Sequence, residues 1–119
     1  MKMLIAISVL VMSISISACG GVMKQYKKEN VEILSVQQLS SGSTEILYQP
    51  TLETMHYCPG ANHRQDGGRE KVVFVRCDIN EKCPVDVVAE KISQGQWKIV
   101  IPSKQDSIDL VFSDGEVRL

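Results

Sequence analysis

The chain has 119 residues, and its 13 lysines and arginines against 14 aspartates and glutamates give a formal net charge of −1. This balance excludes a generic nucleic-acid-binding protein, which carries a basic excess. With 44% apolar and 23% charged residues, the composition is that of one small folded domain, neither disordered nor embedded in a bilayer.

The first 18 residues have the pattern of a secretory signal peptide. Lys2 provides a positive start, an apolar run follows over Leu4–Ile16, and the small pair Ser17-Ala18 precedes Cys19. The run is shorter than the roughly 20 apolar residues that a membrane-spanning helix needs. We therefore predict a cleaved leader over residues 1–18.

Ile16-Ser17-Ala18-Cys19 resembles the lipobox of bacterial lipoprotein precursors, in which an aliphatic residue and two small residues precede a cysteine. The resemblance implies that Cys19 receives a covalent diacylglycerol on its thiol and a fatty acyl chain on its new N-terminus. It also implies delivery to the outer membrane, facing the periplasm, because Gly20 and not an aspartate follows the cysteine. Cleavage by an ordinary signal peptidase, which would leave the thiol bare, is the alternative.

Residues 19–30 are expected to form the lipidated tether. The pair Gly20-Gly21 and the polar run Lys24–Asn30 offer too few apolar groups to pack. Two or more acyl chains hold a protein stably on a membrane, whereas one chain anchors it only marginally. Residues 31–119 are then predicted to form a single β-rich domain.

Short strands dominate the prediction for this domain. In the segment Val31–Val36 the apolar positions change parity, which predicts a strand with a bulge near Ile33-Leu34. A second strand is predicted over Thr44–Gln49. The β-branched and aromatic run Val72–Val75 predicts a strand buried on both faces, and it is the best candidate for the core.

Segment 84–93 is ambiguous. Val85, Val88 and Ile92 fall on one helical face, but valines disfavour a helix. The segment 93–96 reads as a turn into a return strand at Trp97–Ile101, so we predict a strand and keep a helix as the alternative. Because Trp97 opens this apolar run, we expect it to contribute to the core and not to stack on a ligand.

The chain is predicted to end in a β-hairpin. Asp114-Gly115 lies between the apolar runs Ile108–Phe112 and Glu116–Leu119, and a glycine there favours a tight turn. The predicted fold class is all-β, a small antiparallel sandwich or barrel of six to seven strands. An α+β fold with a helix at 84–93 is the alternative.

Lipidation of Cys19 would leave Cys58, Cys77 and Cys83, an odd number of thiols in an oxidising compartment. If Cys77 and Cys83 lie on a hairpin, their Cα atoms come within the distance that a disulfide requires. We therefore predict a disulfide between Cys77 and Cys83. A disulfide from Cys58 to either of them is the alternative.

Both histidines and one cysteine lie within the segment Met55–His63. Thiolate and imidazole groups suit copper or zinc, so His56, Cys58 and His63 are candidate metal ligands. The spacing lacks the paired ligands of structural zinc sites, and a solvated surface loop with a disulfide-bonded cysteine is the simpler interpretation. A third hypothesis makes Cys58 a nucleophile with one histidine as its base, which spacing alone does not support.

These patterns predict a lipid-anchored protein of the bacterial cell envelope that acts as a non-enzymatic binding or assembly component. The expected partners are the membrane, through the anchor, and an envelope protein contacted through an edge strand or residues 50–70. No catalytic residues and no cofactor besides the lipid are expected. The alternative is a periplasmic metal-binding or redox-handling lipoprotein that uses His56, Cys58 and His63.

Overall fold

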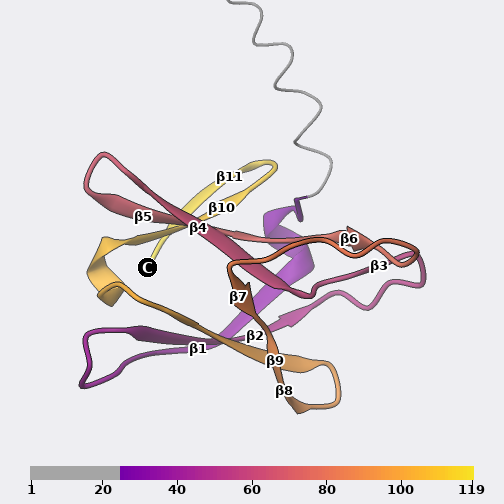
Figure 1. Ribbon diagram of the computed structural model, residues 1–119, viewed down its shortest axis with the longest axis horizontal. Coiled ribbons are helices and arrows are strands. Elements are labelled where there is room, and N and C mark those ends of the chain that lie inside the picture. Colours follow the sequence, from indigo (N-terminus) through magenta and orange to yellow (C-terminus); the bar gives the residue numbers. More distant parts are fainter. Residues whose placement is uncertain (1–24) are drawn as a thin grey trace, which may run out of the picture.

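The computed structural model describes residues 25–119, and this part of the chain consists almost entirely of strands (Figure 1). The predicted leader and Cys19 lie outside the described residues. In chain order the elements are the short 3-10 helix η1 (Lys28–Asn30), β1 (Val31–Gln38), β2 (Thr44–Pro50), β3 (His56–Tyr57), β4 (Gly60–Asp66), β5 (Arg69–Phe74), β6 (Cys77–Asp78), β7 (Val87–Val88), β8 (Glu90–Ser93), β9 (Gln96–Ile101), the 3-10 helix η2 (Gln105–Ser107), β10 (Ile108–Phe112) and β11 (Gly115–Arg118). The predicted all-β fold class is confirmed.

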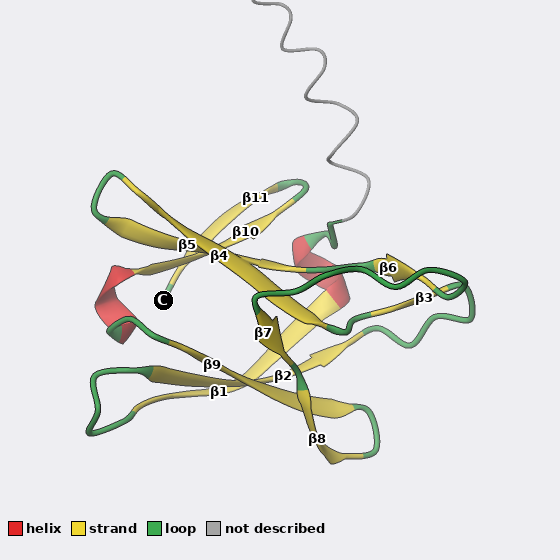
Figure 2. Cartoon of the chain, in the orientation of Figure 1, coloured by secondary structure: helices red, strands yellow, loops and turns green. Residues whose placement is uncertain are grey.

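Two larger sheets and one small ribbon make up the fold (Figure 2). One sheet has the strand order β1-β2-β9-β8, the other has the order β11-β10-β5-β4-β7, and β3 pairs with β6 in a two-stranded ribbon at one end of the molecule. All strand pairs are antiparallel except β5 with β10. This parallel pair departs from the antiparallel expectation, because the chain leaves the first sheet after β9 and enters the second beside β5.

The hydrophobic core lies between the two larger sheets. The central strands β2 and β5 bury alternate side chains, as a pleated sheet with one covered face requires. The four-stranded sheet contributes Ile46, Tyr48, Ile99 and Ile101, and the five-stranded sheet contributes Val72, Phe74, Ile108 and Leu110, all at most 1% exposed. The rings of Tyr48 and Phe74 meet across the two layers at a centroid distance of 4.4 Å.

Local strand predictions hold with one exception. The register of β1 against β2 shifts between Ile33 and Ser35, which confirms the predicted bulge. In β5, Val72 and Phe74 are buried, but Val73 is only half-buried. The prediction of burial on both faces is therefore wrong for β5, because no layer covers the outer face of this sheet among the described residues.

The ambiguous segment 84–93 forms strands, and the helix alternative is wrong. Strand β7 pairs with β4, and β8 pairs with β9 through the predicted turn. The chain ends in the predicted hairpin of β10 and β11.

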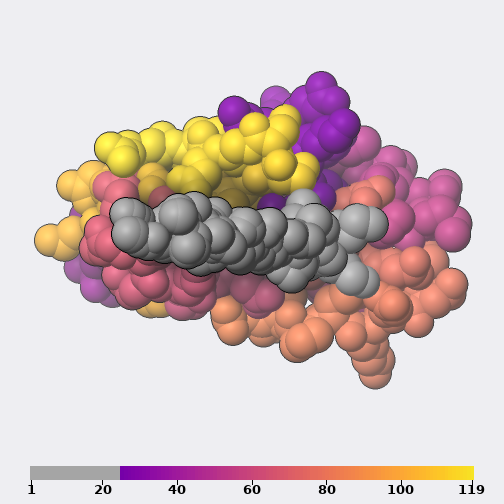
Figure 3. Space-filling model, turned by 90° about the horizontal axis from the view of Figure 1, so that it is seen from above, coloured from indigo at the N-terminus to yellow at the C-terminus, as the bar shows by residue number. Residues whose placement is uncertain are grey.

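The segment 25–30, which the sequence assigned to the tether, packs against the domain. Tyr26 is only 3% exposed and belongs to the core, and Gln25 forms a β-bridge with Val75. The Ser113 amide donates a hydrogen bond of 2.9 Å to the Tyr26 carbonyl, so the C-terminal hairpin lies beside this segment (Figure 3). The prediction missed this packing because Tyr26 is the one large apolar side chain among the polar residues 25–30, and its burial helps to hold the segment against the domain.

Candidate functional site

A pocket of about 710 Å³ opens between the loop that follows β2 and the β8–β9 hairpin. Its walls come from three stretches of chain: residues 26–32, residues 49–59 and residues 91–97. Pro50 ends β2, and the chain then runs without regular pairing until β3. The volume lies within the range of roughly 300–1,000 Å³ that is typical of ligand sites, so this pocket is the candidate binding site.

Aromatic and apolar groups line much of the pocket. Tyr26 and Cys58 are buried at 3% and 7% exposure, and Trp97 is partly buried against the core. Leu52, on the loop, is 95% exposed, and Tyr57, in β3, is 39% exposed. The structure therefore gives Trp97 both the core position that the sequence predicts and a place in the wall of the pocket.

Carboxylates outnumber cationic side chains among the lining residues. Glu29, Glu32 and Glu53 line the pocket together with a single lysine, Lys91. Arg76 engages Glu53 through two hydrogen bonds, of 3.1 Å from Nε and 2.8 Å from Nη2. The bond from the Arg76 guanidinium holds the pKa of Glu53 below its ordinary value, so this carboxylate is ionised and already neutralised.

The thiol of Cys58 is enclosed at the inner side of this loop. Its Sγ lies 3.6 Å from the Tyr48 hydroxyl and 3.4 Å from the Gly60 carbonyl oxygen, to which it donates. Burial raises the pKa of Cys58 above its ordinary value. The thiol is therefore kept protonated near neutral pH, which is the opposite of the activation that a nucleophilic cysteine needs.

The structure does not assemble the predicted metal ligands. His56 and Cys58 both line the pocket, but His63 lies on β4, where its Nδ1 contacts the buried carboxylate of Glu70. Gln65 and Ser103 also donate to Glu70, so that carboxylate is fully engaged. His63 thus belongs to a polar cluster of the five-stranded sheet.

Within residues 25–119, one group of three potential ligand atoms lies within 4.8 Å of one another, and it consists of Cys77, Glu81 and Cys83. The two sulfurs of this group form the predicted disulfide between Cys77 and Cys83, with a Cα separation of 6.0 Å. Cys58 remains a free, buried thiol, so the alternative pairings are wrong.

The disulfide joins Cys77 of β6, the strand that pairs with β3, to Cys83 in the loop that follows β6. The Tyr57 hydroxyl donates a hydrogen bond of 2.9 Å to the Glu81 carbonyl within the disulfide loop. Met55 and Ile79 on this ribbon and its flanks are more than half exposed, at 57% and 53%. Tyr57, which lines the pocket, is thus hydrogen-bonded to the cross-linked loop.

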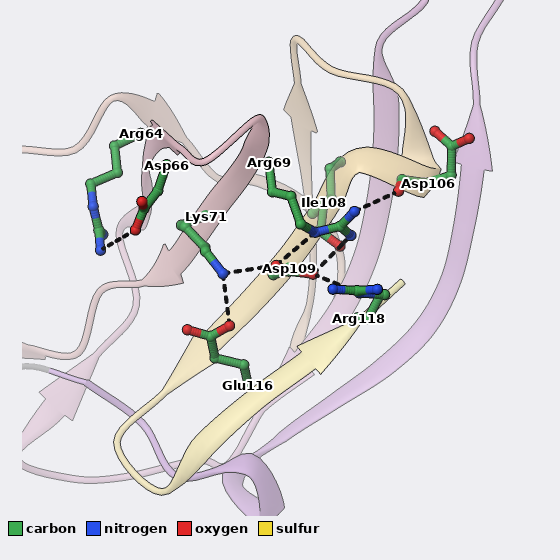
Figure 4. A network of polar contacts seen from close by, with 9 residues as sticks. All are labelled: Arg64, Asp66, Arg69, Lys71, Asp106, Ile108, Asp109, Glu116 and Arg118. Atoms are coloured by element: carbon green, nitrogen blue, oxygen red, sulfur yellow. Dashed lines mark hydrogen bonds and ion pairs between the residues drawn. The ribbon is translucent and has the colours of Figure 1, made fainter.

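A second polar cluster, on the outer face of the five-stranded sheet, is self-contained (Figure 4). Asp109 is 3% exposed and accepts hydrogen bonds from Arg69, at 2.8 and 2.9 Å, and from Lys71, at 2.8 Å. Arg118 lies 3.5 Å from the same carboxylate, and Lys71 also bonds Glu116. The bonds from Arg69 and then Lys71 hold the pKa of Asp109 far below its ordinary value. This network joins β5, β10 and β11 and leaves its central carboxylate fully paired.

Comparisons with protein families, with curated proteins and with solved structures found no match for this chain. No helix in the part of the chain that the structure describes is long and apolar enough to cross a membrane.

Sequence reasoning found the loop but not the whole site. Residues 50–70 were predicted as a contact region, and residues 50–59 form one wall of the pocket. The opposite walls, with Tyr26, Glu32 and Lys91, were missed. No local pattern marks these residues, because they come from segments far apart in the sequence, and Glu32 and Lys91 share a sheet only through β2 and β9.

Proposed function

We propose that this protein is a lipid-anchored component of the bacterial cell envelope that binds a ligand or partner and performs no catalysis. The observation that carries the proposal is the lipobox-like sequence that ends at Cys19. The disulfide between Cys77 and Cys83 agrees with it, because structural disulfides persist in oxidising compartments such as the periplasm.

The short distance along the chain from Cys19 to the folded domain supports a role at the membrane surface. Gln25 already pairs with Val75 of the domain, so only five residues, 20–24, lie between it and the proposed anchor at Cys19. The six steps from Cys19 to Gln25 span at most about 20 Å at full extension. An anchored domain would therefore stay close to the membrane, where confinement raises its effective concentration toward envelope partners.

The pocket supports a binding role more than a catalytic one. Cys58 is the thiol that an enzyme or redox mechanism would use, and it contacts Tyr48 and Gly60. Burial raises the pKa of this thiol and so disfavours the thiolate that nucleophilic attack requires. The lining combines aromatic and apolar side chains with a larger number of polar and charged ones, and such a mixture can both bury and orient a bound ligand.

Intact mass spectrometry of the protein extracted from membranes tests the anchor. We expect a chain that begins at Cys19 and carries the added mass of a diacylglycerol and one fatty acyl chain. The variant Cys19→Ser should lose this mass and leave the membrane fraction, whereas Cys58→Ser, the same substitution at the buried thiol, should keep both. Firm membrane retention of Cys19→Ser, or a chain that begins elsewhere, would refute the anchor.

A metal scan of the same purified protein tests the binding role against the metal-handling alternative. We expect neither copper nor zinc at stoichiometric levels. One equivalent of either metal, lost in Cys58→Ser, would replace the proposed binding function with metal handling.

A further inference from the structure

We propose that the pocket bounded by residues 26–32, 49–59 and 91–97 binds an organic cation, an ammonium group carried on an apolar body of small-molecule size. The inference deepens the proposed function and rests on it for its biological setting. The binding chemistry itself depends only on the pocket.

The apolar part of the ligand is inferred from the inner wall. Tyr26, Cys58 and Trp97 present ring and thiol surface there, and neither Tyr26 nor Cys58 is more than 7% exposed. A volume of about 710 Å³ accommodates a small molecule. Apolar walls of this kind favour a ligand body that is better buried than hydrated.

The positive charge is inferred from the carboxylates that remain unneutralised. Glu53 is already paired with Arg76, whereas Glu29 and Glu32 take part in no ion pair among the described residues. Lys91 is the one lysine that lines the pocket, so the two carboxylates leave a net negative wall. A cationic ligand would gain from this field, and an anionic ligand would be repelled by it.

Two aromatic rings strengthen this preference. Tyr57 and Trp97 line the same pocket, one from β3 and one from β9. An ammonium group is attracted to the electron-rich face of such rings, and tryptophan is the best of them. Neutral ligands would share the apolar contacts but not this attraction.

Trp97 also provides the assay, because it is the single tryptophan of the chain. Its fluorescence is titrated in the full membrane-extracted protein, reconstituted in phosphatidylcholine vesicles, with three probes of one shape: 4-phenylbutylammonium, 4-phenylbutanol and 4-phenylbutanoate. We expect the ammonium probe to bind about fivefold more tightly than the alcohol, and the carboxylate to bind most weakly. Equal affinities, or a preference for the carboxylate, would overturn the proposal.

Matched charge variants separate the pocket from general surface charge. In the double variant Glu29→Gln, Glu32→Gln, the ammonium probe should bind about fivefold more weakly, while the alcohol should be unaffected. Glu45→Gln removes one glutamate charge from β2 outside the pocket and should leave the affinity for the ammonium probe unchanged, and the single variant Glu32→Gln, its one-charge match inside the pocket, should weaken it. An unchanged affinity for the ammonium probe in the double variant would also overturn the proposal.

Alkylation of Cys58 supplies a second measurement that does not depend on fluorescence. We expect the bound ammonium probe to slow the reaction of this thiol with iodoacetamide, because both occupy the same pocket. If no probe changes either signal, the pocket is not a cation site, even where the mass spectrum confirms the anchor. If Cys19 proves unlipidated, the same titration in buffer still tests the pocket.

Discussion

Reduction of the Cys77–Cys83 disulfide is expected to lower the midpoint of thermal unfolding by about 10–20 °C. The two cysteines are six residues apart, and for a closed loop of this size the loss of chain entropy corresponds to about 2.4 kcal/mol at 25 °C. For a domain of this size, each 1 kcal/mol shifts the midpoint by about 4–8 °C. Cys77 is fully buried, so the disulfide restrains a residue that is packed in the folded domain.

Circular dichroism melts with and without a phosphine reductant measure this shift. The variant Cys58→Ser should keep the full effect of the reductant, because Cys58 is the free thiol. The double variant Cys77→Ser, Cys83→Ser should not respond to it. A shift below about 2 °C in the unmodified protein, or a response abolished by Cys58→Ser, would refute the assigned pairing or its role in stability.

Three further predictions concern the sheets. In Gly60→Ala the new Cβ would lie 2.0 Å from the Val87 carbonyl oxygen, so β7 must move away, and urea unfolding should show a loss of about 1–3 kcal/mol. In Gly42→Ala the new Cβ meets no atom within 4 Å. Only the φ of +93° disfavours the alanine, so the free energy of unfolding should fall by about 1 kcal/mol in the same assay. Leu110→Ala empties a fully buried position between the sheets and should cost about 2–5 kcal/mol in urea unfolding with little change in the native spectrum. The lowered pKa of Asp109 means that its ionised form stabilises the fold above about pH 4 and that this contribution is lost as the pH falls further. Unfolding measured from pH 7 to pH 2 should therefore show a weaker acid dependence in Asp109→Asn, and an unchanged one would contradict this assignment.

Local periodicity was sufficient to predict most of the strands. The alternation of apolar residues, the change of parity near Ile33 and the turn at Ser93–Gln96 are short-range features that the sheet pairing preserves. The disulfide was predictable for the same reason, since Cys77 and Cys83 lie six residues apart on one turn of chain. Each of these predictions depended only on residues that are close together in the sequence.

Long-range packing decided the features that were missed. The parallel pairing of β5 with β10 joins residues about 38 apart, such as Ile108 and Glu70, and no local pattern specifies such a partner. Tyr26 was assigned to a polar tether, yet the C-terminal hairpin and the core bury it. The pocket depends on the burial of Tyr26, because this residue forms part of its wall.

The position of His63 shows how a local signal could have corrected the proposed metal site. Gly67-Gly68, with φ of +64° and +82°, forms the two-residue loop of the β4–β5 hairpin, a conformation that favours glycine at both positions. This turn sets Gln65 opposite Glu70, and His63, two residues earlier, lies on the same face of the sheet. A hairpin predicted from the glycine pair would therefore have placed His63 beside Glu70, on a paired strand. Within Met55–His63, His56 and Cys58 would then have been assigned to one site and His63 to another.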